Sequence, residues 1–582
     1  MKTNKYIALV VLIGSLMMSS CVQTDIDDAL EYDQHYKTTE DADNAILGVY
    51  SSFMRMADQM LILNELRGEL TDLTIHSGQE LQEIDAANPS ELNTLADPTS
   101  YYNVILNCND ALENFRIMYE NNRMTQEEFR ERFADLTAMR CYMYLQLAAQ
   151  FGRVHYITRP LVNLRDMKSY RDSAKIDIDQ LLPRLITDME NLEFMDPYVT
   201  SPLVQHNLDG YDLSYFFINK KLMLADLYLW NGDYLQAATL YKELMDTYSD
   251  GPATENCYTY KLAAATTWTT ATAYSTWAYQ IFFLRYKEDD MEAYNNQWVN
   301  IFSDDMTARR IRYEWIWSMS YDAAFEPSFP LIDLFAKPED GGSYLLKPSA
   351  YAVEDLFGSQ KMQNGFTLDG RGPEASYYQS PDGEYVISKY LYRYDPGKPY
   401  ERAGRLYLYR GGLLHLRYAE AANRAGYPDV AYAIVNQGIA GTYGVGLESV
   451  VDYPEPFYFD PRYTTTPYYR GPWRYNFGIR GRAWLQSKET SAFADKTLAE
   501  CTNKQDSIQV MEKIIMDECA LECAYEGHRF PDLVRVARRM NREAEGAGNT
   551  YMQAVLQGKY LKSGRSLPDY SNEENWFLPF YE

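Results

Sequence analysis

Long hydrophobic runs are missing from almost the entire chain. Beyond the first twenty residues there is no run of about 18 apolar residues, which excludes a membrane-spanning helix from that part of the sequence. The G-x-S-x-G, Walker A, H-E-x-x-H and G-x-G-x-x-G motifs are missing too. The common nucleophile elbow, phosphate loop, zinc helix and dinucleotide site therefore have no counterpart in this sequence.

Cysteine is scarce, with seven residues among 582 and no C-x-x-C pair. Cys519 and Cys523 lie at i,i+4 on an expected helix, without the second pair or nearby histidines that a zinc site requires. For the six cysteines that follow Cys21 we therefore expect buried thiols, with one disulfide at most. No metal site and no cofactor is predicted, although a structural calcium ion held by scattered Asp side chains stays open.

Basic residues are outnumbered, whereas tyrosine is abundant. The chain has 55 Lys and Arg against 82 Asp and Glu, a net charge of −27, which argues against nucleic-acid binding. It has 52 Tyr but only 23 Phe and nine Trp. Tyrosine combines an apolar face with a polar tip and suits surfaces that bind while staying wet, although most of these rings are expected to fill seams between helices.

The only strongly apolar segment lies at the N-terminus. Lys2 and Lys5 precede the apolar residues 6–18, and two serines stand just before Cys21. This arrangement predicts a signal peptide over residues 1–20 and resembles a bacterial lipoprotein signal, in which the cysteine is acylated and becomes the mature N-terminus. Lipidation of Cys21 would hold the protein on a membrane through a tether, residues 21–37. The alternative is an ordinary secretion signal with an incidental cysteine.

The first half of the sequence predicts one helix after another. A Thr followed by acids opens the helix that begins near residue 39, and Thr125 with Glu128 three residues later predicts a capping box for a long helix that closes at Gly152. Residues 213–248 resemble a tetratricopeptide unit, two helices joined by an Asn-Gly-Asp-Tyr turn. The residues at the expected places are Ala225, Tyr228, Gly232, Tyr234 and Ala237.

Two more helix pairs are expected in the second half, over residues 411–439 and 506–540. Between them, and over residues 251–405, the sequence becomes irregular and rich in Trp, Tyr, Ser and Thr. The predicted fold is therefore mostly α, a scaffold of tetratricopeptide-like helix pairs with long, irregular, aromatic-rich insertions in the C-terminal half. We divide it into an N-terminal helical region, 38–250, and a C-terminal region, 251–582.

Five segments in order resemble the SusD/RagB family of outer-membrane nutrient-binding lipoproteins. They are YKTTEDADNAILGVYSSF, LTAMRCYMYLQLAAQFGRVHYI, KLMLADLYLWNGDYLQAATLYKEL, LHLRYAEAANRAG and ECALECAYEGHRFPDLVR. The last of them, residues 518–535, is the most specific, and the resemblance extends from residue 21 to about 580.

The resemblance implies a protein that catalyses nothing and lies on the cell surface, lipid-anchored to the outer membrane. Such proteins cap a SusC-like TonB-dependent transporter and capture an oligosaccharide, or a peptide in the RagB branch. The acids Asp25, Asp27 and Asp28 also resemble the signal that sends lipoproteins to the outer face, although a plain solvated tether has the same composition.

A capture site needs flat aromatic faces and a few hydrogen-bonding groups. Family members bind ligand at the loop after the first helix and at the central insertions, which makes Asp72 and His76 polar candidates here. The central aromatics among small residues are stacking candidates, and Arg371 and Tyr377 are weaker candidates. The stacking candidates are Trp268, Tyr274, Trp277 and Trp298.

Two other interpretations stay open. Glu526, His528, Arg529 and Asp532 lie close together as in a catalytic site, but we interpret them as charges that tie a helix hairpin around Gly527. A secreted helical glycoside hydrolase would need only two suitably spaced carboxylates, which so acidic a chain always offers. A helical-repeat lipoprotein that only scaffolds a partner protein is the second alternative.

Overall fold

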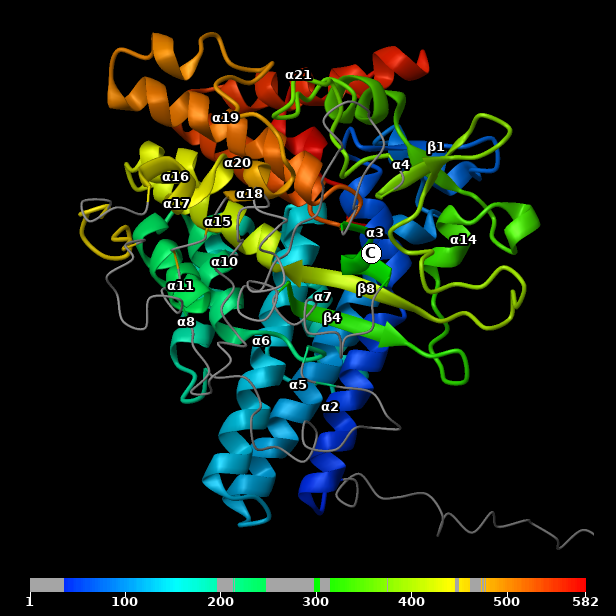
Figure 1. Cartoon of the computed structure of the whole chain (residues 1–582). Helices are drawn as coiled ribbons and strands as arrows, with labels where there is room; N and C mark the ends of the chain where they lie inside the picture. Colours follow the sequence, from blue (N-terminus) through cyan, green and yellow to red (C-terminus); the bar gives the residue numbers. More distant parts are fainter. Residues whose placement is uncertain are drawn as a thin grey trace, which may run out of the picture.

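The computed structural model describes residues 36–195, 213, 215–246, 298–303, 314–373, 375–444, 450–460, 473, 476 and 478–581. Figure 1 shows a molecule built mainly of helices, with the long helices α2, α5 and α6 projecting at one end and α19 and α21 lying at the other. Four of the predicted functional residues, Cys21, Trp268, Tyr274 and Trp277, lie outside the described residues.

Two N-terminal helices, α2 and α6, begin where the sequence signals indicated, and α6 also ends as predicted. Thr38 caps α2 through a capping box with Asp41, and Thr125 caps α6 in the same way with Glu128. Gly152 ends α6 at a φ of 70°. The helices of this half are α2 (Thr39–Met54), α3 (Ala57–Glu65), α4 (Gln79–Asp85), α5 (Thr99–Glu120), α6 (Gln126–Phe151), α7 (Leu164–Arg171), α8 (Ile178–Glu190), α10 (Lys220–Asn231) and α11 (Tyr234–Asp246).

The expected tetratricopeptide-like unit is present as α10 and α11. Asn219 caps α10 by accepting a hydrogen bond from the Leu222 amide, and Gly232 turns the chain at a φ of 92°. The second half adds α13 (Trp298–Ser303), α14 (Leu331–Phe335), α15 (Gly411–Arg424), α16 (Pro428–Val435), α17 (Gly438–Tyr443), α18 (Gly478–Arg482), α19 (Lys504–Glu522), α20 (Arg529–Glu543) and α21 (Ala547–Ser563).

Helix pairs stack side by side, which confirms the predicted mostly helical, tetratricopeptide-like fold. Each of α5, α6, α8, α10, α11, α15 and α19 packs against the next in this order, so that the core runs continuously from the blue helices to the orange ones (Figure 1). Apolar side chains of α2 and α5 are buried in this core, among them Phe53 and Ile105. A pair of helices cannot bury its own apolar face, and stacking covers it.

Strands form four antiparallel pairs among the described residues. The longest, β4 (Trp315–Tyr321) with β8 (Gly404–Arg410), crosses the middle of the molecule (Figure 1). The expected strand at Trp315 and Trp317 is thus present, and both rings are buried, as expected for packing residues. The other pairs are β1 (Thr71–Leu73) with β5 (Leu346–Pro348), β2 (Arg153–Val154) with β3 (Ile176–Asp177), and β6 (Tyr377–Gln379) with β7 (Tyr385–Ile387).

Short helical turns complete the described chain. A π-helical turn spans Ala352–Phe357, and the 3₁₀ turns are Thr94–Ala96, Pro338–Asp340, Leu498–Glu500 and Glu573–Trp576. None of the helices in the described part is long and apolar enough to cross a bilayer. The cysteines described, at positions 108, 141, 501, 519 and 523, are free thiols.

An ion-pair network is buried where α19 meets β8. Glu522 contacts Arg371 at 2.7 Å, Arg410 at 2.8 Å and Arg482 at 2.5 Å, and none of these side chains is exposed. Burial works to raise the pKa of Glu522, but the charges of the three arginines outweigh it and hold that pKa well below its ordinary range. The segment 518–535 therefore ties the C-terminal helices to the central strands.

Three of the four residues that lie together as in a catalytic site, Glu526, Arg529 and Asp532, are also buried, and His528 is partly buried. Glu526 pairs with Lys389 and Arg410, Arg529 pairs with Glu69, and Asp532 pairs with Arg417. Burial, and then the charge of Arg417, lower the pKa of His528 to about 4, so the imidazole is neutral at pH 7.

Candidate functional site

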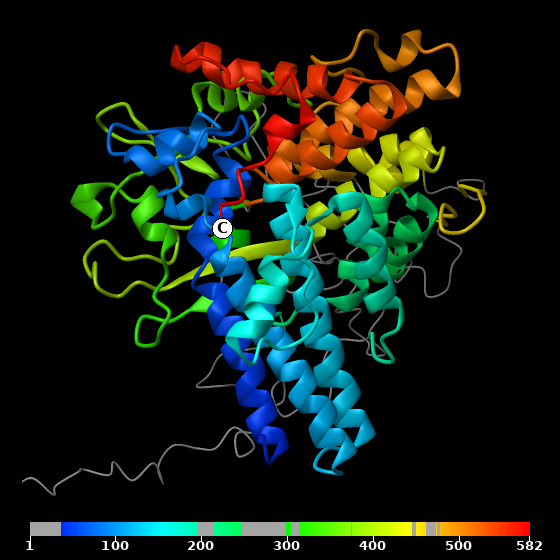
Figure 2. The same cartoon turned by 180° about the vertical axis from the view of Figure 1, so that it is seen from behind.

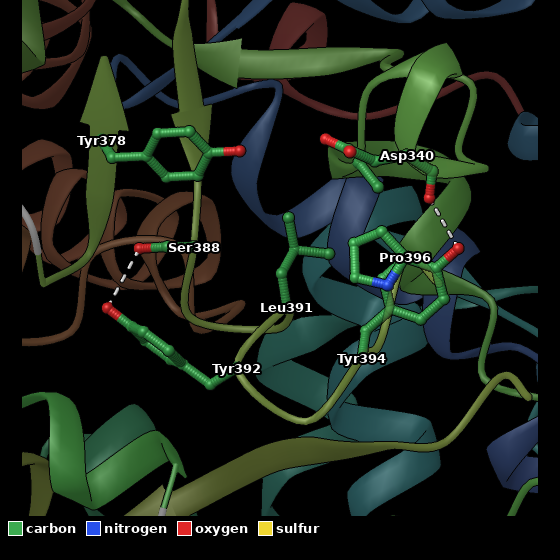
Figure 3. A pocket seen from close by; sticks show the side chains of 8 residues that line it. Asp340, Tyr378, Ser388, Leu391, Tyr392, Tyr394 and Pro396 are labelled. Carbon is green, nitrogen blue, oxygen red and sulfur yellow. Dashed lines mark hydrogen bonds between the residues drawn. The ribbon is translucent and has the colours of Figure 1, made fainter. Parts of the chain in front are cut away.

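A tyrosine-rich pocket of about 270 Å³ lies beside the short hairpin of β6 and β7. This volume is close to the lower end of the range of about 300–1,000 Å³ that is usual for small-molecule sites. Figure 3 shows residues of three segments converging on it. The lining residues are Ala336, Asp340, Tyr378, Ser388, Leu391, Tyr392, Tyr394 and Pro396.

The hairpin presents one tyrosine to the core and the next one to the pocket. Tyr377 and Tyr378 are successive residues of β6, so their side chains point to opposite faces. Tyr377 is buried against Phe357, with ring centroids 5.6 Å apart, whereas Tyr378 is half-buried and lines the pocket. In Figure 3 the Tyr378 hydroxyl points across the pocket toward the side of Asp340.

The loop that follows β7 supplies most of the other lining residues. Its inner side is fixed by Lys389, which pairs with Glu526 at 2.7 Å, and by Tyr390, which stacks on Phe335. With these two residues anchored in the core, the same loop presents Tyr392 and Tyr394 to the pocket. A buried, fixed support under a binding loop keeps its exposed groups in place before a ligand arrives.

Hydrogen bonds to the backbone hold the two loop tyrosines. The Tyr392 hydroxyl donates to the Ala375 carbonyl at 2.6 Å and lies 3.3 Å from Ser388 Oγ. The Tyr394 hydroxyl donates to the Asp340 carbonyl at 2.6 Å, as drawn in Figure 3. Burial raises the pKa of Tyr394 above its ordinary value, so this phenol stays protonated and remains a donor at neutral pH.

The charge of the pocket is acidic. Asp340 lines it, and among the described residues no Lys, Arg or His does. The cations nearby are already paired: Lys337 with Asp382, Lys347 with Glu384 and Arg402 with Asp333. The pocket therefore offers tyrosine faces, hydroxyl groups and one carboxylate, a set that suits an uncharged, hydroxyl-rich ligand.

His76 lies in the loop after β1, in a part of the fold joined to this hairpin. Its ring is 6.3 Å from that of Tyr344, whose hydroxyl donates to the Tyr385 carbonyl of β7 at 2.7 Å. The loop is held to the same segment by Ser77 Oγ, which donates to the Leu345 carbonyl at 2.6 Å. His76 itself is exposed, so it remains a candidate for a ligand that extends beyond the pocket.

Asp72 lies in β1 and its carboxylate is already engaged. It forms an ion pair with Arg565, just beyond the end of α21, and accepts the Leu73 amide at 2.7 Å. Its side chain is 10% exposed. In the described structure Asp72 therefore joins the first loop to the last long helix.

Trp298 and Arg371 lie in the buried ion-pair network and not at a surface. Arg371 contacts Asp369, Glu518 and Glu522, and its side chain has no exposed area. The Trp298 ring lies over Arg410, 5.0 Å from its guanidinium carbon, and is also fully buried. As placed here, neither residue offers a face on which a sugar ring stacks.

Sequence reasoning missed Tyr378, Tyr392, Tyr394 and Asp340. A signal for the hairpin was present, since Pro-Asp-Gly at 381–383 separates two short β-prone runs. Strand alternation would then have placed Tyr377 and Tyr378 on opposite faces, but it does not predict which of the two faces is the outer one. The loop tyrosines gave no such signal, because the buried pair of Lys389 with Glu526 spans more than a hundred residues.

A larger hollow, about 1090 Å³, surrounds the last described residues. Its charged lining is largely paired, as in Arg538, which contacts both Glu573 and Asp179. Among the described residues, no three His, Cys, Asp or Glu side chains are grouped as a metal site would require. The tyrosine pocket is therefore the better candidate site.

Comparisons with known proteins agree with this fold. Residues 477–580 match the model of the SusD family. A SusD superfamily protein from Bacteroides vulgatus is similar in structure with a TM-score of 0.56 at 14% identity, over 92% of this chain and 96% of that one. No protein with a curated function matches the sequence.

Two further solved structures are similar at comparable levels. One is the surface glycan-binding protein A from Bacteroides uniformis, with a TM-score of 0.55 at 17% identity, over 93% of this chain and 96% of that one. The other is a laminarin-binding SusD-like protein, with a TM-score of 0.54 at 15% identity, over 94% and 96%. At such identities the structures show a shared fold. The pattern of the SusD family thus lies in residues 477–580, and the fold of most of the chain is the one seen in these SusD-like structures.

Proposed function

We propose that this protein is a non-catalytic, surface-exposed lipoprotein of the outer membrane that captures oligosaccharides and delivers them to a SusC-like TonB-dependent transporter. The observation that carries the capture step is the pocket of Tyr378, Tyr392 and Tyr394 beside Asp340. Sugar rings expose C–H faces that pack on tyrosine, while their hydroxyl groups need donors and acceptors at the rim. The pocket has both.

The similar structures support a glycan as the ligand. Two of them are named for binding glycans, one as a laminarin-binding SusD-like protein and one as a surface glycan-binding protein. The pocket has room for one or two sugar rings. The rest of a longer oligosaccharide would therefore lie on the protein surface and extend in one direction toward His76. We therefore expect oligosaccharides to bind more tightly than the monosaccharide.

Retention at the membrane is assigned to Cys21. The segment around it has the layout of a lipoprotein signal, and two or more acyl chains on one cysteine hold a protein stably without a spanning helix. Mass spectrometry of the protein from its native membrane checks this part on its own: acylated Cys21 is expected, and an unmodified N-terminus at another residue would refute it.

Calorimetric titration tests the capture step. The soluble form lacking residues 1–21 is titrated with neutral oligosaccharides and with peptides of varied length, and each ligand is then examined for cleavage. Saturable binding of an intact oligosaccharide is the expected result. Binding of peptides alone would place the protein in the peptide-capturing branch, and cleavage that a carboxylate substitution abolishes would make it a glycoside hydrolase.

Delivery is tested by co-purification from the native membrane. A SusC-like barrel that co-purifies with the protein in detergent is expected, and the titration repeated with the barrel present would show whether the two proteins complete the site together. Recovery of the protein without any such barrel under mild detergent would refute the delivery step and leave capture untouched.

A further inference from the structure

A third hollow lies between α5 and the segment around α7. It is a groove of about 660 Å³ lined by Tyr102, Leu106, Leu164, Met167, Lys168 and Arg171, among other residues. Figure 2 shows the C-terminal segment, in red, descending beside these helices, and its Phe580 and Tyr581 close one side of the groove. We call this hollow the α5–α7 groove.

The α5–α7 groove is apolar inside, and its apolar groups are uncovered. None of the residues of α7 is buried. Leu164 is 82% exposed and Met167 55%, and both line the groove. A surface helix normally turns such side chains into the core, so a helix that leaves them open in a groove presents a surface for a partner.

The edge of the groove is basic, in a protein whose net charge is −27. Lys168 and Arg171 line it, and among the described residues neither forms an ion pair with a carboxylate. One acid, Asp97, also lines the groove, but its carboxylate accepts the Thr99 amide at the start of α5. The surface therefore fits a partner that is both apolar and acidic.

The described part of the chain begins close to this groove. Tyr36, the first described residue, donates its hydroxyl to Asp110 of α5 at 3.4 Å, and its carbonyl accepts a hydrogen bond from Arg123 at 3.1 Å. Asp110, Leu106 and Tyr102 follow one another at four-residue intervals along one face of α5. The groove thus begins one helical turn, about 6 Å, from the residue that Tyr36 contacts.

The residues before Tyr36 have the matching chemistry. Residues 22–35 contain five acids, Asp25, Asp27, Asp28, Glu31 and Asp33, and no Lys or Arg. Ile26, Leu30 and Tyr32 stand among these acids. Fourteen residues can span up to about 46–50 Å, several times the distance along α5 to the far end of the groove.

We propose that the α5–α7 groove is the docking site of the chain's own N-terminal segment, residues 22–35, with its apolar side chains in the groove and its acids against Lys168 and Arg171. The segment is joined covalently, so its effective concentration at the groove is in the millimolar range and a weak contact suffices. Where Cys21 is lipidated, as proposed above, docking shortens the link between membrane and body and turns this face of the protein toward the membrane.

Photo-crosslinking tests the docking in the mature-length chain. The chain from residue 21 with Cys21→Ser carries benzoylphenylalanine in place of Leu30, and mass spectrometry locates the crosslinks after illumination. Crosslinks to residues 97–106 and 161–171 are expected, with Met167 a preferred target. The double variant Lys168→Glu/Arg171→Glu should lower their yield at least fivefold.

Matched variants separate docking from a general charge effect. Arg165→Glu/Lys361→Glu changes the net charge by the same amount at exposed sites outside the groove lining and should leave the yield unchanged. Asp27→Lys/Asp28→Lys in the groove double variant should restore it. Crosslinks that map elsewhere, that persist equally in all variants, or that appear only between two copies of the chain would overturn the proposal.

Discussion

Tyr378 shows how a single position decides what this protein presents to a ligand. It follows the buried Tyr377 in β6, and only the alternation of the strand separates a core residue from a pocket residue. The hydroxyl groups of Tyr392 and Tyr394 are committed to backbone carbonyls, so these two residues shape the pocket as much as they contact a ligand. Tyr378 is therefore the residue whose removal should affect capture most directly.

Replacing Tyr378 by Ala removes one stacking face without disturbing the core. We expect oligosaccharide affinity to fall about tenfold, which corresponds to ~1.4 kcal/mol, while the melting temperature stays within a degree or so. Calorimetric titration and thermal unfolding measure the two effects. The control is Tyr400→Ala, since Tyr400 is 94% exposed and does not line the pocket. An equal loss of affinity in both variants would contradict the assignment.

A second prediction at this scale concerns Glu522, which contacts Arg371, Arg410 and Arg482 with no exposure to solvent. Glu522→Gln leaves three buried guanidinium groups short of a counter-charge, and breaking a buried pair by removing one partner costs about 3–5 kcal/mol. Unfolding in urea should show a loss of this size. Glu113→Gln removes an exposed partner of Arg116 and should cost about 1 kcal/mol or less. Similar losses in the two variants would disprove the importance of the network.

At the scale of whole elements, the junction of α3 with the turn between α19 and α20 joins the two ends of the sequence. Glu65, the last residue of α3, accepts the amides of Gly527 at 2.7 Å and His528 at 3.2 Å. Gly527 has a φ of 82°, a backbone conformation that favours glycine. The turn at Glu526, Gly527 and His528 is thus held by the carboxylic acid of a residue more than four hundred positions earlier in the chain.

The ionisation of Glu65 makes this junction sensitive to pH. Burial raises the pKa of Glu65 from 4.5 to about 8, although the two amides act against the shift. Between these two values the unfolded chain is ionised while the folded one keeps the proton, so stability falls as pH rises from about 4.5 to 8. Glu65→Gln lacks this loss, and its melting temperature relative to the parent should increase from pH 5 to pH 8.

Thermal unfolding at a series of pH values measures that difference. The comparison with the parent cancels the contributions of all other titrating groups, including those of His528. A constant difference in melting temperature across the range would mean that Glu65 is already ionised in the folded protein at pH 5.

The same elements show what the sequence can predict. The starts of α2 and α6 follow from local caps, Thr38 with Asp41 and Thr125 with Glu128, and such signals are visible within four residues. The burial of Arg371 is different, because it depends on Glu518 and Glu522, which follow 147 and 151 residues later. A local sequence pattern holds no information on contacts of that range, so the helices were predictable and the pocket was not.

At the scale of the whole molecule, the net charge of the protein and the lining of the pocket favour the same class of ligand. The net charge is −27, and the pocket that we assign to capture contains one carboxylate and no cation among its described lining residues. The net negative charge repels anions, and no cation in the described lining of the pocket compensates for that repulsion. Both observations favour neutral oligosaccharides over those that carry carboxylates or sulfates.

Titrations at two ionic strengths separate these ligands. A neutral oligosaccharide has no charge to be repelled, so its affinity should be the same at about 20 mM and about 300 mM salt. A uronate-containing analogue of equal length should bind more weakly at low salt, and its affinity should rise as salt screens the repulsion. Asp340→Asn should narrow the gap between the two ligands at low salt without changing the affinity for the neutral one more than about twofold. A uronate-containing ligand that binds more tightly, or that weakens as salt is added, would require a cation in the site and would move the site away from the tyrosine pocket.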